Sequence, residues 1–189
     1  MKNIVLFASG SGSNAKKIID YFSSNSSIIV SYVLSNNINA KVLEIANQNN
    51  IETFTFDKKQ LEDGSVLKEL LVLNADLIVL AGFLLKCPTH IVAAFKNKII
   101  NIHPALLPKY GGKGMYGMHI HKAVLENKEI ESGITIHYVN ENYDEGAFIF
   151  QKSVSIIDCT TAEEIGVKIL QLEHLHFAEQ IEKLLNSKS

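Results

Sequence analysis

Short hydrophobic runs alternate with segments of helical periodicity along the first hundred residues. Residues 4–8 are apolar at every position, and after the turn from Ser9 to Ser13 apolar residues recur at helical spacing as far as Phe22. An uninterrupted apolar run of this length is typical of a strand buried on both faces, whereas apolar residues three and four apart indicate a helix packed by one face. The pattern therefore predicts a strand, a glycine-containing turn and a helix.

The same alternation continues through residue 102. It predicts strands at residues 28–34, 53–56, 76–81 and 98–102, and helices at residues 40–47, 65–73 and 88–95. Buried strands that alternate with helices form a parallel sheet covered by helices on both sides. The expected fold class is therefore α/β, an open, mostly parallel twisted sheet with helices on both faces and a Rossmann-like N-terminal half.

A different pattern follows this region. Residues 103–118 form a long irregular connection that holds two of the three prolines. After a predicted helix at residues 119–126, two predicted strands at residues 133–139 and 147–155 flank a turn. Two strands joined in this way form a hairpin, so we expect a C-terminal hairpin beside the parallel strands.

The end of the sequence predicts a long helix. Thr160-x-x-Glu163 matches a capping box, and the amphipathic pattern after it continues to about Leu185. We find no internal repeat or linker along the chain. We therefore expect one domain over residues 1–189, divided into halves at residues 1–100 and 101–189.

Length, charge and cysteine content narrow the class of protein. The chain has 189 residues, with 18 Lys and Arg against 20 Asp and Glu, and its length corresponds to roughly 1.3 typical domains. The small net charge disfavours nucleic-acid binding. Two cysteines without a CxxC motif fit a reducing compartment, and the longest apolar stretch, Leu77 to Leu85, is shorter than the ~20 residues of a membrane span. We expect a cytoplasmic protein.

The turn Ser9-Gly10-Ser11-Gly12-Ser13-Asn14 is the first candidate site. In an open α/β sheet, ligands bind outside the carboxyl ends of the strands, and small residues before a helix let backbone N–H groups approach a phosphate. The turn has neither the lysine of a P-loop nor the third glycine of a dinucleotide fingerprint, which argues against ATP and NAD. The alternative is an ordinary strand-to-helix turn.

Asn101 and His103, at the end of a predicted strand, are the second candidate. Side chains two apart in a strand point to the same side, so both can face one ligand atom. An amide donor beside an imidazole suits stabilisation of a developing oxyanion and supplies a group that titrates near neutrality. Alternatively, Asn101 bonds loop backbone and His103 packs beneath the proline-containing connection.

Asp144, in the turn of the predicted hairpin, is the third candidate. A turn carboxylate by itself usually is solvated or bonds its own backbone. If it reaches His103, it raises the pKa of the imidazole and orients the ring.

The seven histidines raise the question of a metal site. His119-x-His121 and His174-x-His176 both lie in predicted helices, where residues two apart point about 200° away from each other. Neither pair is well placed to chelate, so we expect core or surface roles and no metal.

Several segments together resemble a known family. They are the strand with its turn Ser9 to Asn14, Leu80-Ala81-Gly82-Phe83, Asn101-Ile102-His103-Pro104-Ala105-Leu106-Leu107-Pro108, and Asp144-Glu145-Gly146. The chain resembles the phosphoribosylglycinamide formyltransferases, within the superfamily of formyltetrahydrofolate-dependent formyl transferases, over nearly its whole length. The Asn-x-His-Pro-x-Leu-Leu-Pro signature is shared across that superfamily. Gly12-Ser13-Asn14 and Glu173-His174 carry the resemblance to the glycinamide ribonucleotide site.

The resemblance implies transfer of a formyl group from 10-formyltetrahydrofolate to the amine of 5-phosphoribosylglycinamide, an early step of purine synthesis. Asn101 and protonated His103 would stabilise the tetrahedral oxyanion, and Asp144 would hold His103 charged and help relay a proton. The co-substrate is 10-formyltetrahydrofolate, and no metal is required. Residues 1–100 then form a phosphate-binding half, and residues 101–189 form a catalytic and folate-cleft half.

Binding residues are also implied by the resemblance. Gly12, Ser13 and Asn14 match the phosphate-binding turn of the family, and Glu173 matches the acid that meets the ribose hydroxyls. The folate-binding positions comprise Leu84, Leu85, Lys86, Cys87, Asn101 and, near the acidic tail of the folate, Lys59.

The chain departs from the family at three positions and in one loop. Leu85 stands where many members have Arg, Leu170 where the family often has Gln, and Ala105 where Ser is common. The connection at residues 111–117 is longer than in many relatives, and we expect it to be mobile and to close over substrate.

Other activities fit some of the same residues. A formyltetrahydrofolate hydrolase or a sugar-nucleotide formyltransferase would use the same Asn, His and Asp, and a non-catalytic module would bind a phosphorylated metabolite without turnover. The expected partners are small-molecule substrates, with no nucleic acid and no membrane, and the expected state is a monomer or homodimer.

Overall fold

The strands form a single seven-stranded sheet in the computed structural model, which describes residues 1–187. They are β1 (Lys2–Phe7), β2 (Ile28–Ser35), β3 (Glu52–Thr55), β4 (Leu77–Leu80), β5 (Ile99–His103), β6 (Glu131–Tyr138) and β7 (Phe148–Ser155). Their spatial order is β3-β2-β1-β4-β5-β6-β7. Neighbours from β3 to β5 run parallel, whereas β6 pairs antiparallel with β5 and β7 with β6. The predicted mostly parallel sheet and C-terminal hairpin are confirmed.

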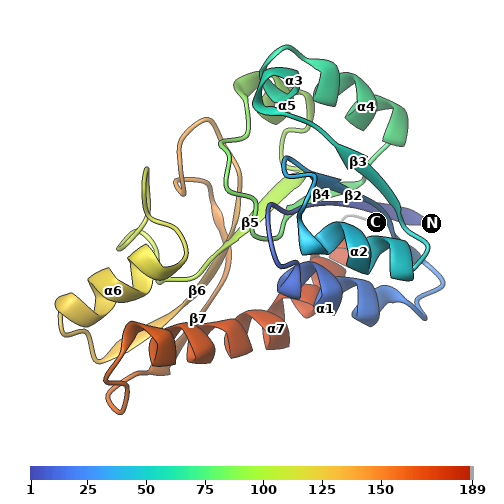
Figure 1. Ribbon diagram of the computed structural model, residues 1–189. Helices are drawn as coiled ribbons and strands as arrows, with labels where there is room; N and C mark the ends of the chain where they lie inside the picture. Colours follow the sequence, from blue (N-terminus) through green and yellow to red (C-terminus); the bar gives the residue numbers. More distant parts are fainter. Residues whose placement is uncertain (188–189) are drawn as a thin grey trace.

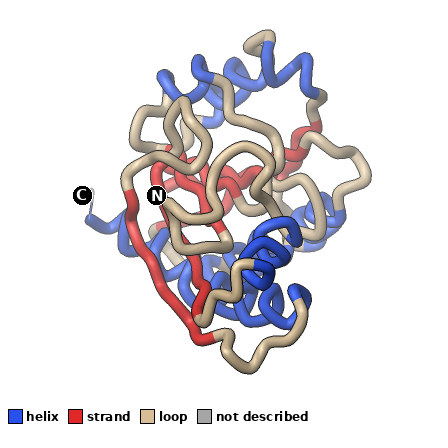
Figure 2. The backbone as a smooth tube through the Cα atoms, turned by 90° about the vertical axis from the view of Figure 1, so that its left-hand side faces the viewer, coloured by secondary structure: helices blue, strands red, loops and turns tan. Residues whose placement is uncertain are grey.

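Helices cover both faces of the sheet. They are α1 (Ser13–Phe22), α2 (Lys41–Gln48), α3 (Lys58–Glu62), α4 (Ser65–Leu73), α5 (Thr89–Ala94), α6 (Met118–Glu126) and α7 (Ala162–Ser187). Helices α1, α2 and α7 lie on one side, and α3, α4 and α5 lie on the other (Figure 1). The view turned by 90° shows helices on both sides of the strands, as the α/β class requires (Figure 2).

Strand β1 is buried on both faces because its alternate side chains enter different hydrophobic clusters. Ile4 and Leu6 pack in the cluster that includes α1, α2 and α7, whereas Val5 and Phe7 pack in the cluster that includes α4 and α5. Each such side chain contributes about 1.5–3 kcal/mol when it is fully buried. The unbroken apolar run at the start of the sequence is therefore the signature of a central strand.

Two local details differ from the sequence-based prediction. The short helix α3 was not predicted; it begins with a capping box in which Gln60 N donates to Asp57 Oδ1 at 2.8 Å and Asp57 N donates to Gln60 Oε1 at 2.9 Å. A helix of one turn is too short to show hydrophobic periodicity. The capping box of Asp57 and Gln60 is the one sequence feature that indicates this helix.

The cap of α7 lies one residue later than predicted. The prediction paired Thr160 with Glu163, but Glu164 N donates to Thr161 Oγ1 at 3.2 Å, and Thr161 N donates to Glu164 Oε2 at 3.1 Å. Because the helix begins at Ala162, Thr161 is the N-cap residue and Glu164 is the third helical residue.

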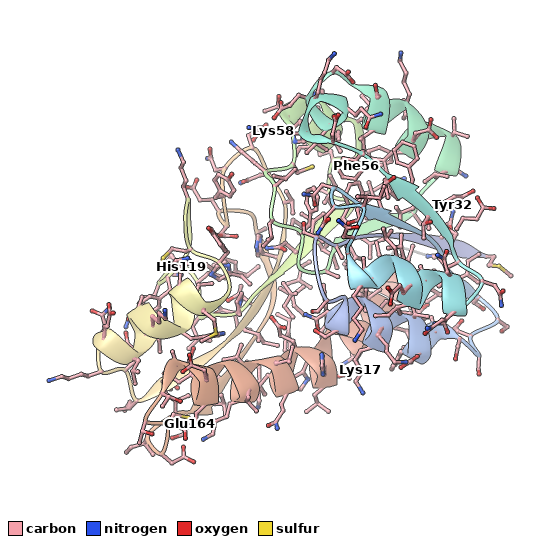
Figure 3. The ribbon with its side chains drawn as sticks, viewed as in Figure 1. Lys17, Tyr32, Phe56, Lys58, His119 and Glu164 are labelled. Carbon is pink, nitrogen blue, oxygen red and sulfur yellow. The ribbon has the colours of Figure 1, made fainter. Side chains whose placement is uncertain are left out.

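Charged side chains lie on the outer surfaces of the helices. Lys17 and Glu164 are exposed on α1 and α7, as the side-chain view shows (Figure 3), whereas Phe56 is buried beneath the helices of the other face. Over residues 1–187 we find no helix with the length and apolarity needed to cross a membrane.

The β6–β7 pair has no room for a side chain at Gly133. A Cβ atom built there would lie 2.1 Å from the Lys152 carbonyl oxygen and 2.6 Å from Leu106 Cδ2. We expect Gly133→Ala to lower the free energy of unfolding by about 1–3 kcal/mol, because backbone of β7 must move. Gly10→Ala, whose Cβ meets nothing within 4 Å, is the control. Equal denaturation midpoints for the two variants would contradict the prediction.

Candidate active site

A cavity of about 920 Å³ opens at the carboxyl ends of the parallel strands. Its walls include the turn after β1, the segment after β4 and the end of β5, as well as parts of the β6–β7 loop and α7. The predicted candidate residues that line it are Ser13, Asn14, Leu84, Leu85, Lys86, Cys87, Asn101, His103, Asp144 and Glu173. Ligands of open α/β folds bind in the crevice outside the carboxyl ends of the strands, where the strand order reverses.

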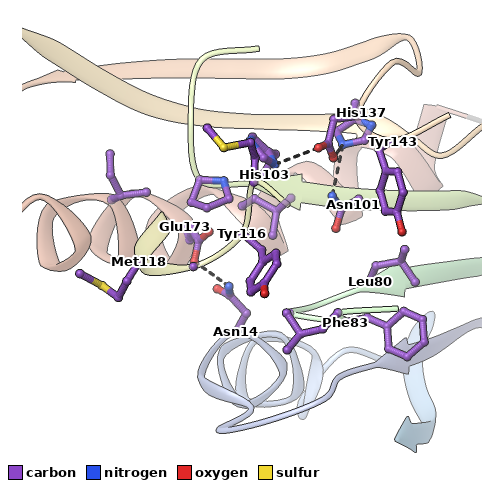
Figure 4. A pocket seen from close by; sticks show the side chains of 18 of the residues that line it. Asn14, Leu80, Phe83, Asn101, His103, Tyr116, Met118, His137, Tyr143 and Glu173 are labelled. Carbon is purple, nitrogen blue, oxygen red and sulfur yellow. Dashed lines mark hydrogen bonds and ion pairs between the residues drawn. The ribbon is translucent and has the colours of Figure 1, made fainter. Parts of the chain in front are cut away.

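The structure brings the three predicted catalytic residues together. Asn101 and His103 lie two residues apart at the end of β5, and Asp144 lies on the β6–β7 loop. Asp144 Oδ2 is 3.6 Å from His103 Nδ1, with both side chains largely buried (Figure 4). An amide, an imidazole and a carboxylate therefore face one end of the same cavity.

His137, on β6, is a further member of this cluster that the sequence-based reasoning missed. Its Nε2 lies 3.2 Å from Asn101 Nδ2 and 3.6 Å from Asp144 Oδ1. The antiparallel register of β5 and β6 places His137 directly opposite Asn101. The sequence signal for His137 is a histidine on the strand that pairs with Asn101. This signal can be used only when the register of the two strands is known.

Backbone carbonyls orient both imidazoles. His103 Nε2 lies 2.8 Å from the Tyr110 carbonyl oxygen, and His137 Nδ1 lies 2.9 Å from the Tyr138 carbonyl oxygen. A carbonyl only accepts, so each of these nitrogens carries a proton. His103 therefore presents Nδ1 toward Asp144, and His137 presents Nε2 toward both Asn101 and Asp144.

The charges of the cluster are coupled. Burial lowers the pKa of His103 below its ordinary value, while the negative charge of Asp144 and the hydrogen bond to Tyr110 oppose the shift. Burial by itself would raise the pKa of Asp144, but its interactions with His137 and His103 outweigh burial and leave the pKa below the ordinary value. Asp144 is thus a carboxylate at neutral pH, and its charge favours protonation of His103.

The two residues that hold His103 have left-handed backbone conformations. Tyr110 has φ 57° and Asp144 has φ 58°, a region in which residues other than glycine are uncommon, although aspartate and asparagine enter it more readily than most. Gly112 N donates to Asp144 Oδ2 at 2.9 Å. The carboxylate is therefore positioned by the connection after β5 as well as by its own loop.

Side-chain hydrogen bonds fix the chain that follows His103. Thr135 Oγ1 donates to the Ala105 carbonyl at 2.7 Å and accepts from Leu107 N at 3.0 Å. Gln151 Nε2 donates to the Leu107 carbonyl at 2.9 Å. The connection leaves β5 along one path because its backbone groups are bonded by side chains of β6 and β7.

At the other end of the cavity, α1 faces α7. Asn14 Nδ2 donates to Glu173 Oε2 at 2.8 Å, and burial raises the pKa of Glu173 to about 7. Asn14 Oδ1 is buried without a hydrogen-bond partner among the described residues. Gly12 has φ 72°, and a Cβ there would lie 2.7 Å from Val42 Cβ, so only glycine fits this turn. Gly12 supports the turn, whereas Ser13 and Asn14 line the cavity.

The segment after β4 forms another wall. Lys86 Nζ lies 5.4 Å from the centre of the Tyr143 ring, and burial raises the pKa of Cys87 to about 12, so its thiol stays protonated and is unsuited to nucleophilic attack. Lys59 lies on α3 and is not among the described residues that line the cavity. Over residues 1–187, no group of three or more His, Cys, Asp or Glu side chains is arranged to hold a metal ion.

The sequence pattern of the formyl transferase family matches residues 2–181. This chain belongs to that family. It is 40% identical to the chloroplastic phosphoribosylglycinamide formyltransferase of Arabidopsis thaliana, over 95% of this chain and 64% of the relative. It is 35% identical to the phosphoribosylglycinamide formyltransferase of Escherichia coli (strain K12), over 91% of this chain and 82% of the relative.

A solved formyl transferase structure has the same fold. The phosphoribosylglycinamide formyltransferase of Anaplasma phagocytophilum superposes with a TM-score of 0.90 at 33% identity, covering 99% of this chain and 88% of that chain. The chain spans 64% and 62% of the length of its relatives from Arabidopsis thaliana and Vigna unguiculata.

The Asp144 carboxylate should control the titration of His103. In Asp144→Asn, we expect the pKa of His103 to fall because the negative charge that raises it is lost. NMR titration of the imidazole resonances measures this shift. Glu145→Gln, which neutralises the adjacent exposed carboxylate, should leave the pKa of His103 unchanged, and an unshifted pKa in Asp144→Asn would show that the two groups do not interact.

Burial of Glu173 predicts a pH-dependent loss of stability. Its folded-state pKa of about 7 lies above its ordinary 4.5, so the folded protein loses stability as pH rises between these values. Glu173→Gln should therefore unfold at a higher denaturant concentration than the parent at pH 8 and at a similar concentration below pH 4.5. Glu163→Gln, on the exposed side of the same helix, should show no such pH dependence. A constant difference between Glu173→Gln and the parent at all pH values would contradict this assignment.

Proposed function

We propose that this protein transfers the formyl group of 10-formyltetrahydrofolate to the amine of 5-phosphoribosylglycinamide in purine (IMP) biosynthesis, giving formylglycinamide ribonucleotide and tetrahydrofolate. The observation that carries the proposal is the convergence of Asn101, His103 and Asp144 in one cavity with the Asn14–Glu173 pair at its other end. Membership of the formyl transferase family and the names of its relatives support the same reaction.

The catalytic residues surround the place where negative charge develops. The substrate amine attacks the formyl carbon, a C–N bond forms, and the carbonyl electrons move to oxygen. Asn101 retains an amide N–H beyond the one directed at His137, and the 3.6 Å between His103 Nδ1 and Asp144 exceeds a hydrogen-bond length. Both donors are therefore available to the oxyanion.

The proton that the amine loses is transferred to the folate within the cavity. The attacking nitrogen loses a proton as the tetrahedral species forms, and the folate N10 must gain one as its bond to the formyl carbon breaks. Asp144, alone or through water, accepts the proton and passes it to N10, and the oxyanion returns to a carbonyl. The Asp144 charge also supports the imidazolium of His103, which burial would otherwise disfavour.

The two ends of the cavity suit the two substrates. Backbone N–H groups at Gly12, Ser13 and Asn14 stand at the N-terminus of α1, where they would bind the phosphate, and Glu173 would accept hydrogen bonds from the ribose hydroxyls. The folate would occupy the wall formed by Leu84, Leu85, Lys86, Cys87 and Asn101, with Lys59 near its acidic tail. Leu85 supplies no guanidinium, so pterin recognition there depends on backbone groups.

The proposed setting follows from the chemistry of the substrates. Both are soluble small molecules, and we infer a cytoplasmic enzyme without nucleic-acid or membrane partners. A monomer or homodimer remains our prediction for its oligomeric state.

The proposal is tested by following the formyl donor with and without 5-phosphoribosylglycinamide. We expect donor consumption to require the amine, and Asn101→Ala to lower kcat/KM by about 10²–10³-fold because one oxyanion donor is lost. Asn101→Asp should be slower still, since a carboxylate repels the oxyanion. Asn127→Ala, at the exposed end of α6, is the control. Donor consumption without the amine would identify a hydrolase, and turnover only with a sugar-nucleotide amine would identify the other alternative.

A further inference from the structure

The glycine-rich loop before α6 follows a defined path. Gly112, Gly114 and Gly117 have φ of 95°, 90° and 51°, and Cβ atoms added to them would meet nothing within 4 Å. Glycine therefore occupies these positions because of the backbone conformation and not because a side chain would be crowded. Met115 N donates to the Gly112 carbonyl at 3.1 Å, and its side chain packs against the core.

This path carries Tyr116 to the cavity. The Tyr116 carbonyl accepts from His119 N at 3.2 Å, and the two rings meet edge to face with centroids 5.2 Å apart. Although 52% of Tyr116 is exposed, it lines the cavity. The close-up draws its ring between the Asn14–Glu173 pair and Asn101, with Tyr143 on the far side of Asn101 (Figure 4).

A half-exposed aromatic side chain in this place adds little to the core, but it offers two binding features. The ring face attracts the C–H groups of a sugar, and the phenol hydroxyl both donates and accepts hydrogen bonds. Asn14 and Glu173, which line the same cavity, are polar and buried. The wall around Tyr116 therefore combines an aromatic surface with hydroxyl-binding groups.

We propose that Tyr116 binds the ribose of the amine substrate, with its ring against the sugar and its hydroxyl sharing the sugar hydroxyls with Glu173. This inference rests on the proposed function and assigns a substrate-binding role to the loop. It makes Tyr116 a determinant of affinity for the phosphoribosyl substrate. The formyl donor would bind at the wall formed by the segment after β4.

The test separates the two substrates. We expect KM for 5-phosphoribosylglycinamide to rise about tenfold in Tyr116→Ala and about threefold in Tyr116→Phe. In both variants, kcat and the KM for 10-formyltetrahydrofolate should each change less than about twofold. Calorimetric titration with 5-phosphoribosylglycinamide alone should give matching losses of affinity. Tyr143→Ala is the matched control, because Tyr143 lines the same cavity near Asn101 and Lys86, and it should leave this affinity unchanged.

The outcomes distinguish the inference from the proposed function. If the parent protein formylates 5-phosphoribosylglycinamide and Tyr116→Ala binds it as tightly, the role of Tyr116 is wrong and the function stands. Equal losses for both substrates, or for Tyr116→Ala and Tyr143→Ala, would also overturn it. If the parent neither binds nor formylates this substrate, the proposed function fails. Matched thermal midpoints of the variants exclude unfolding as the cause of any loss.

Discussion

The site depends on one negative charge held between two buried imidazoles. Asp144 lies 3.6 Å from His103 and 3.6 Å from His137, and removing a carboxylate from water costs several kcal/mol unless partners compensate for it. The rings and the Gly112 amide supply that compensation. Three chain segments, β5, β6 and the glycine-rich loop, therefore meet around a single carboxylate.

The sheet explains why these segments meet. The parallel strands direct their carboxyl ends, and thus Asn101, toward one edge of the sheet, while the reversal of direction at β6 brings His137 opposite Asn101. The β6–β7 loop then returns over the same edge with Asp144. The mixed strand direction therefore matters for the chemistry, because the antiparallel register pairs Asn101 with His137.

Sequence patterns predicted the long-range architecture better than its local details. The apolar run of β1 and the alternation after it were sufficient for the parallel sheet, because burial on two faces leaves a plain signal. Helix α3 was missed since five residues show no periodicity, and two adjacent threonines and glutamates made the α7 cap ambiguous. His137 was missed for a different reason: it is separated from Asn101 by 36 positions, and periodicity does not report strand register.

The left-handed backbone of Asp144 restricts which residues fit at this position. At φ 58°, asparagine, aspartate and glycine are the residues that adopt the conformation with least strain. Of these three, only aspartate carries a charge. Glutamate carries the same charge, but it would be strained in this backbone conformation. Backbone conformation and electrostatics therefore both favour aspartate at this position.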